Sequence, residues 1–114
     1  MLNQIRYNGF SYVVNAASGT IITSTNLVVW TLRTSGFGST TINDLAYGTV
    51  YLAVGTSGTL RTSTDAISWT FRTSGFGTTN IVTSAYAPGL TEDYIIAGDS
   101  GTLRSSTDGI AWTF

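Results

Sequence analysis

The chain has 114 residues, 42% of them hydrophobic and 12% aromatic, which is enough for one domain with a packed core and excludes a disordered chain. Five basic and six acidic residues give a net charge of −1 without any basic cluster, which argues against nucleic acid as a partner. No apolar run reaches the roughly 20 residues of a membrane span, so no membrane partner is expected. Without cysteine, the fold depends on packing rather than on disulfides, in any compartment.

The composition favours strands over helices. Thirteen glycines and many threonines and serines accompany a single proline, Pro88, and lysine is absent. Threonine and the other β-branched residues suit strands, while glycine and serine supply the turns between them. The sequence therefore predicts an all-β fold.

The chain consists of three copies of one unit, at residues 2–41, 42–80 and 81–114. The three tryptophans, Trp30, Trp69 and Trp112, lie 39 and 43 residues apart. The three Ser-Gly-Thr triplets have the same two spacings. The units differ in length only in presumed turns, near residues 8–9 and in residues 87–93, as expected of a structural repeat.

The second unit shows the strand pattern most clearly, with strands expected over residues 42–47, 50–54, 60–63 and 69–73. Turns that contain Gly or Asp separate these short runs, which is typical of antiparallel hairpins. Four antiparallel strands in about 40 residues is the content of one β-propeller blade. The sequence therefore predicts three four-stranded blades in one chain.

The hexapeptide RTSGFG occurs at residues 33–38 and again at residues 72–77, where it is expected to connect one blade to the next. The glycine-flanked Phe37 and Phe76 are candidate glycan contacts, or else their rings lie buried beneath the crossing. Arg33 and Arg72 are candidate ligand-binding residues, since arginine binds carboxylates, or else they pair with acids of the protein or cover the faces of tryptophan rings. Both interpretations of each pair remain open.

A turn closed by an acid or amide precedes each tryptophan. Asn26, Asp65 and Asp108 each lie four residues before a tryptophan and two residues after a serine. An oxygen of such a side chain can accept hydrogen bonds from backbone N–H groups two residues on, which makes these residues structural. We expect the three tryptophans to be largely buried between blades.

This Ser-x-Asp pattern with its following tryptophan resembles the Asp-box (BNR) repeat, and the three units resemble propeller repeats of bacterial and phage-associated proteins. The resemblance covers nearly the whole chain, but the turn is one residue shorter than the usual box, and Asn26 replaces the aspartate. It implies a propeller in which the box joins the third and fourth strands of each blade.

Asp-box propellers include sialidases, but the sequence does not favour an enzyme. The resemblance implies an arginine cluster, a Tyr–Glu pair and an acidic proton donor, whereas Glu92 is the only glutamate here and His, Cys and Lys are absent. No catalytic residue, cofactor or metal site is expected. The Glu92–Asp93 pair could help to hold a calcium ion, or could be a solvated loop.

A three-blade arc would leave two apolar outer faces bare. Propellers hold four to eight blades, so six is the one multiple of three in that range, and we expect two chains to close a ring. The chain starts at an expected first strand, stops at an expected fourth, and lacks a third RTSGFG, which suits a break between subunits and equally suits a piece cut from a longer propeller. The predicted function is a non-enzymatic, self-assembling scaffold or interaction module. The alternative is a lectin-like propeller with repeated glycan sites.

Overall fold

The computed structural model describes residues 2–7, 9–87 and 94–113, and for residues 2–4 it describes the backbone alone. Over these residues the chain forms 11 strands in three antiparallel sheets, with two short 3-10 turns, η1 (Thr56–Gly58) and η2 (Asp99–Gly101). The prediction of an all-β fold is confirmed. Glu92 and Asp93, the candidate calcium ligands, lie outside the described residues.

Each sheet is a simple meander of strands that follow one another in the chain. Sheet 1 contains β1 (Leu2–Tyr7), β2 (Tyr12–Ala16), β3 (Thr20–Ser24) and β4 (Thr31–Arg33). Sheet 2 contains β5 (Ile42–Tyr47), β6 (Tyr51–Gly55), β7 (Thr59–Ser63) and β8 (Thr70–Thr73). Sheet 3 contains β9 (Ile81–Tyr86), β10 (Tyr94–Gly98) and β11 (Leu103–Ser106).

Within the described residues, sheet 3 has three strands, where the sequence predicted a four-stranded unit. In place of a fourth strand, Thr113 makes a single bridge to Ser105. The two residues exchange both backbone hydrogen bonds, at 2.8 and 2.9 Å. Phe114, the next residue, lies outside the described part of the chain.

The hairpin between the second and third strands of each sheet is set by a residue with positive φ. Ser18, Ser57 and Ser100 have φ of 59°, 57° and 63°, and each is followed by a glycine that also has positive φ. Glycine adopts this left-handed region without the steric cost of a Cβ. The repeated Ser-Gly-Thr triplet is therefore the turn that reverses the chain.

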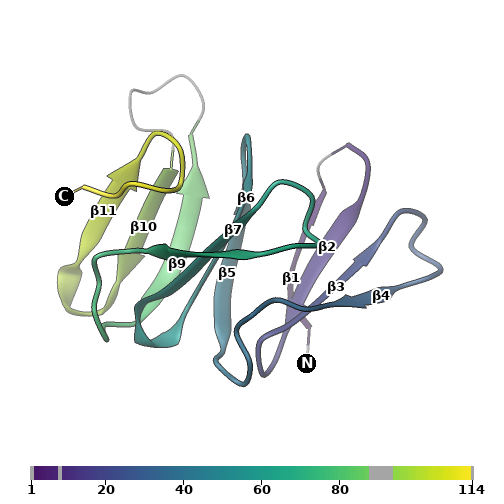
Figure 1. The fold of residues 1–114 in the computed structure, drawn as a ribbon, viewed down its shortest axis with the longest axis horizontal. Helices are drawn as coiled ribbons and strands as arrows, with labels where there is room; N and C mark the ends of the chain where they lie inside the picture. The colour runs from purple at the N-terminus through teal and green to yellow at the C-terminus, as the bar shows by residue number, and fades with distance from the viewer. Residues whose placement is uncertain (1, 8, 88–93, 114) are drawn as a thin grey trace.

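The three sheets lie side by side, with sheet 2 between the other two (Figure 1). The first strands are the neighbours at one edge of this arrangement, since β5 contacts both β1 and β9. Two hydrophobic cores fill the spaces between sheets. Core 1, between sheets 1 and 2, includes Val13, Ile21, Phe37, Ile42, Leu45, Tyr51, Ala53 and Ala66. Core 2, between sheets 2 and 3, includes Ala46, Leu52, Val54, Leu60, Phe76, Ile81, Tyr94 and Ile96.

Strand β6 is buried on both of its faces. Tyr51 and Ala53 contribute to core 1, whereas Leu52 and Val54 contribute to core 2. Successive side chains of a strand point to opposite faces, so this alternation places one apolar set against each neighbouring sheet. Each fully buried leucine or valine contributes about 1.5–3 kcal/mol. A strand with apolar residues at every position is stable here because sheet 2 has a neighbour on each side.

Asp44 on β5 links the first strands of all three sheets. Its Oδ2 accepts hydrogen bonds from the backbone N–H of Ser84 at 2.7 Å and from the hydroxyl of Thr83 at 3.1 Å. On the other side, Arg6 of β1 lies 3.6 Å from its Oδ1. A buried carboxylate needs such partners to offset the loss of hydration. Asp44 therefore connects β1, β5 and β9.

The two outermost faces of the arrangement expose apolar side chains. On sheet 1 these include Ile5, Tyr7, Leu27 and Trp30, and on sheet 3 they include Val82 and Leu103. Leu27 is also held at a φ of 64°, in the left-handed region. In the part of the chain that the structure describes, no helix has the length and apolar character to cross a membrane.

Candidate functional site

The box turns have the hydrogen bonds of an Asx turn in all three sheets. In sheet 2, Oδ1 of Asp65 accepts from the backbone N–H of Ile67 at 2.8 Å and of Ser68 at 3.1 Å. The hydroxyl of Ser63 donates to the same oxygen at 3.0 Å and accepts from the backbone N–H of Ala66 at 2.8 Å. These bonds close the reversal between the third and fourth strands.

A charged carboxylate is not required for this turn. Asn26 accepts from the backbone N–H groups of Val28 and Val29 at 2.8 and 2.9 Å, with a neutral amide in place of the acid. The backbone hydrogen bond from Ile67 lowers the pKa of Asp65 below its ordinary value of 3.8, and that from Ile110 lowers the pKa of Asp108 in the same way. Both aspartates are therefore ionised at neutral pH.

The tryptophans do not share one environment, contrary to the expectation that all three are largely buried. Trp69 packs against core 1 and Trp112 against core 2, and each remains partly exposed. Each lies against the sheet that precedes its own. Trp30 is exposed at 36%, because sheet 1 has no preceding sheet within the chain. Within the single chain Trp30 is therefore not buried, since the equivalent turn is covered only where a neighbouring sheet lies against it.

The two RTSGFG segments form the same buried connector. The hydroxyl of Ser35 donates to the carbonyl of Gly19 at 2.6 Å and accepts from the backbone N–H of Phe37 at 3.1 Å. Ser74, Gly58 and Phe76 repeat this pair of bonds at 2.9 and 3.1 Å. The repeated hexapeptide is therefore the connector that joins successive sheets.

Phe37 and Phe76 are not exposed ligand contacts in this structure. Their exposed fractions are 4% and 5%, and the rings contribute to core 1 and core 2. The glycines before and after each ring have positive φ, between 59° and 82°, which lets the chain fold the ring inward. Of the two interpretations that the sequence allowed, the buried one is correct.

Arg33 and Arg72 have matching positions at the ends of β4 and β8. The Nε–H of Arg33 donates to the hydroxyl of Thr23 at 2.9 Å, and Arg72 makes the same bond to Thr62 at 2.9 Å. Neither arginine forms an ion pair with a residue that the structure describes. Arg61 of β7 lies over the rings of Phe37 and Phe71, with its Cζ 6.0 and 5.6 Å from the ring centroids.

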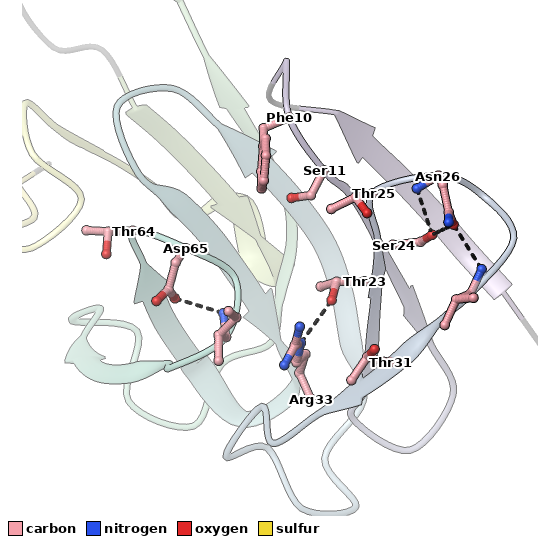
Figure 2. Close-up of a pocket in the computed structure, with 12 residues that line it drawn as sticks. Phe10, Ser11, Thr23, Ser24, Thr25, Asn26, Thr31, Arg33, Thr64 and Asp65 are labelled. Atoms are coloured by element: carbon pink, nitrogen blue, oxygen red, sulfur yellow. Dashed lines mark hydrogen bonds between the residues drawn. The ribbon is translucent and has the colours of Figure 1, made fainter.

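Arg33 lines a pocket of about 410 Å³ between sheets 1 and 2 (Figure 2). Thr23, Thr31 and Arg33 form the wall from sheet 1, and Asp65 and Ile67 belong to the wall from sheet 2. Figure 2 shows the guanidinium of Arg33 bonded to Thr23, with Asp65 on the neighbouring sheet. Phe10, two residues before β2, also lines this pocket. The pocket thus places a cation and an anion on facing elements.

A second pocket of about 280 Å³ repeats this construction between sheets 2 and 3. Thr62, Thr70 and Arg72 replace the three residues of the first wall, and Asp108 and Ile110 replace those of the second. Sequence reasoning identified Arg33 and Arg72 but missed their hydrogen-bond partners Thr23 and Thr62. Their signal was present in the repeat, since each threonine lies ten residues before its arginine.

The aspartates that the structure describes lie in separate parts of the fold. Among the described residues there is no cluster of three or more His, Cys, Asp or Glu side chains that could hold a metal ion. The carboxylate of Asp44 accepts a hydrogen bond from Ser84 of β9, while Asp65 and Asp108 close turns. Comparison with protein-family models, with curated proteins and with solved structures finds no match to this chain.

Proposed function

We propose that the chain is a self-assembling β-propeller module, in which two copies close a ring of six blades that serves as a scaffold or interaction surface without catalytic activity. The three similar sheets, packed face to face in chain order, support this proposal. The observation that carries it is the difference in burial between equivalent residues of inner and outer faces.

On the sheet 1 side, the exposed residues have buried counterparts one repeat later. Leu27 is exposed at 51%, whereas its counterpart Ala66 is at 0% in core 1. Ile5 is likewise exposed, whereas its counterpart Leu45 is fully buried. The face of sheet 1 therefore has the character of a face that a preceding sheet covers.

On the sheet 3 side, the relation is reversed. Leu103 is exposed at 53%, whereas its counterpart Leu60 is at 0% in core 2. Ala85 is exposed, whereas its counterpart Ala46 is buried in the same core. The face of sheet 3 therefore has the character of a face that a following sheet covers.

These two faces are of complementary kinds, which supports a second copy of the chain as the occupant. Within the chain, the Leu60 face of sheet 2 packs against sheet 3, and the Ala66 face of sheet 2 packs against sheet 1. A second copy would repeat this junction by placing its Leu27 face on the Leu103 face. Two chains related by a two-fold axis would make two identical junctions and leave no outer face bare.

The first experiment measures the mass of the protein in solution by light scattering. We expect about twice the chain mass of 12.1 kDa. Leu27→Asp and Leu103→Asp should each give the mass of a single chain, because each places a charge at a junction. Val28→Asp is the matched control for Leu27→Asp, because its counterpart Ile67 is exposed within the chain. This control should keep the mass of the dimer.

A mixing experiment tests the pairing of the two faces. In a mixed dimer of the two single-chain variants, one junction carries both substitutions and the other carries neither. Mixing should therefore restore part of the dimer. A single-chain mass for the unaltered protein, a mass of three chains, or a dimer that survives both substitutions would contradict the proposal.

The alternative function, glycan binding, loses Phe37 and Phe76 as contact residues because both rings are buried. Arg33 and Arg72 remain in its favour, since each lines a pocket between sheets.

A further inference from the structure

The two pockets between sheets have the size and construction of binding sites. The first pocket, of about 410 Å³, falls within the roughly 300–1,000 Å³ of small-molecule sites, and the second, of about 280 Å³, lies just below that range. Both lie within a single chain, so their existence does not depend on ring closure.

Each pocket sets a guanidinium and a carboxylate on different walls. Arg33 and Asp65 line the first pocket, and Arg72 and Asp108 line the second, which Asp65 lines as well. Neither pair forms a salt bridge in the described part of the chain, so their charged atoms are more than 4.0 Å apart. The two charged groups of each pair are therefore not bonded to each other.

The arginine of each pocket is held in place by only one of its nitrogens. The Nε–H of Arg33 bonds to Thr23, and that of Arg72 bonds to Thr62. Arginine has five N–H donors, so the bond to threonine fixes the plane of the guanidinium and leaves the Nη groups as donors.

The carboxylate is held in the same way by one of its oxygens. The hydrogen bonds that close the turn go to Oδ1 of Asp65 and to Oδ1 of Asp108. Each aspartate therefore has Oδ2 as an acceptor beyond those of the turn. A fixed donor and a fixed acceptor on facing elements are what a ligand with hydroxyl groups requires, because a hydroxyl both accepts and donates.

Apolar side chains complete the walls. Phe10, Val29 and Ile67 line the first pocket, and Val50 and Ile110 line the second. A sugar ring presents C–H groups as well as hydroxyls, and such walls can cover those C–H groups. In the first pocket the opposite charges of Arg33 and Asp65 give no preference for a ligand with a net charge. In the second pocket the two carboxylates would repel an anion, and the guanidinium of Arg72 would repel a cation, so a ligand without net charge suits both pockets.

We propose that these two pockets bind neutral saccharides, with ring hydroxyls that accept from the guanidinium of Arg33 or Arg72 and donate to the carboxylate of Asp65 or Asp108. Each chain then carries two sites. Repetition of the sites would strengthen binding to a surface that displays many copies of one glycan.

The test begins with the intact protein on an array of neutral and sialylated glycans. We expect binding to glycans with neutral terminal sugars. Titration with galactose, glucose, mannose, fucose and N-acetylglucosamine, followed by NMR, should then give two sites per chain for the sugar that binds best. Retention of sialylated glycans alone, or of no glycan at all, would overturn the proposal.

Substitutions then assign the two sites. Arg33→Met and Arg72→Met should each reduce the stoichiometry from two to one, and the double variant should lower binding at least tenfold overall. Arg6→Met removes the same charge outside both pockets and should bind as the unaltered protein does. Unchanged binding in the double variant, or equal loss in Arg6→Met, would place the sugar elsewhere.

Asp65→Asn separates the role of the charge from that of the turn. Asn26 closes the same turn with an amide, so this variant should keep its melting temperature. Asp65 lines both pockets, so both should weaken when its charge is removed. The two proposals fail in different ways. A single-chain mass with sugar binding retained would mean that ring closure fails, whereas a dimer mass with sugar binding lost would mean that the saccharide sites fail.

Discussion

The hydroxyl of Tyr94 in sheet 3 bonds to both backbone groups of Val50 in sheet 2. It accepts from the N–H of Val50 at 2.9 Å and donates to the carbonyl of the same residue at 3.1 Å. Tyr94 is fully buried in core 2, so one side chain supplies apolar contact and two polar contacts between neighbouring sheets.

Tyr94→Phe tests this contact. The variant keeps the ring but leaves the N–H of Val50 without its partner, so the free energy of unfolding should fall by about 1–3 kcal/mol in urea denaturation. Tyr86→Phe is the control, since Tyr86 packs beside Tyr94 with its ring centroid 5.0 Å away. An equal loss in both variants would show that the hydroxyl of Tyr94 has no special role.

Asp44→Asn tests the link between the first strands of the three sheets, β1, β5 and β9. The amide nitrogen would face either the N–H of Leu45 or the donors of Thr83 and Ser84, so one donor must meet another. We expect a loss of about 1.5–3 kcal/mol in the free energy of unfolding. Asp99→Asn, at an exposed residue, should cost less than about 0.5 kcal/mol. A smaller effect at residue 44 than at residue 99 would count against the link.

The tryptophans should differ in their contribution to stability. In a Leu103→Asp background, where subunit contact cannot contribute, Trp69→Ala should cost about 2–3 kcal/mol because the ring is half-buried against core 1. Trp30→Ala should cost less than about 1 kcal/mol in that background, since the ring is covered by no neighbouring sheet. Equal losses, measured by urea denaturation, would mean that the two environments do not differ as described.

The box turns should make stability depend on pH in acid. The pKa of Asp65 and of Asp108 is lowered in the folded chain, first by the backbone N–H of Ile67 and of Ile110 respectively. Their contribution is therefore complete above the ordinary value of 3.8 and is lost as pH falls from there through the folded-state pKa. Urea midpoints measured from pH 6 to pH 2 should decline below about pH 4.

The double variant Asp65→Asn, Asp108→Asn checks the origin of that decline. Its turns should close as the Asn26 turn does, and its stability should fall less steeply in acid. A slope identical to that of the unaltered protein would assign the decline to other carboxylates.

The sequence predicted the sheets well because their signals are local. Residues 42–47 were expected to form a strand and do so as β5. Alternation of side chains and the Ser-Gly turns act within a few residues, so the pattern is legible in each copy. The fourth strand of sheet 3 was predicted from the similarity of its residues to those of the other units, yet among the described residues only Thr113 pairs there, with Ser105.

Contacts between sheets were less predictable because they join residues far apart in the chain. Trp30 and Trp69 have closely similar local sequences, yet only one lies against another sheet. The pocket that joins Arg33 to Asp65 depends on how two sheets pack, which no short segment encodes. Repetition nevertheless gave a partial signal, since both arginines were identified from their matching positions.

Leu27 illustrates how folding and association can be opposed at one residue. Its φ of 64° is a conformation in which a leucine costs roughly 1–2 kcal/mol, and the equivalent residue of sheet 3 is Gly109, at a φ of 78°. Glycine at residue 27 would therefore make a single chain easier to fold, while in the proposed ring it would remove an apolar contact from each of two junctions. Selection for a sturdier chain and selection for a tighter assembly would then act on this codon in opposite directions.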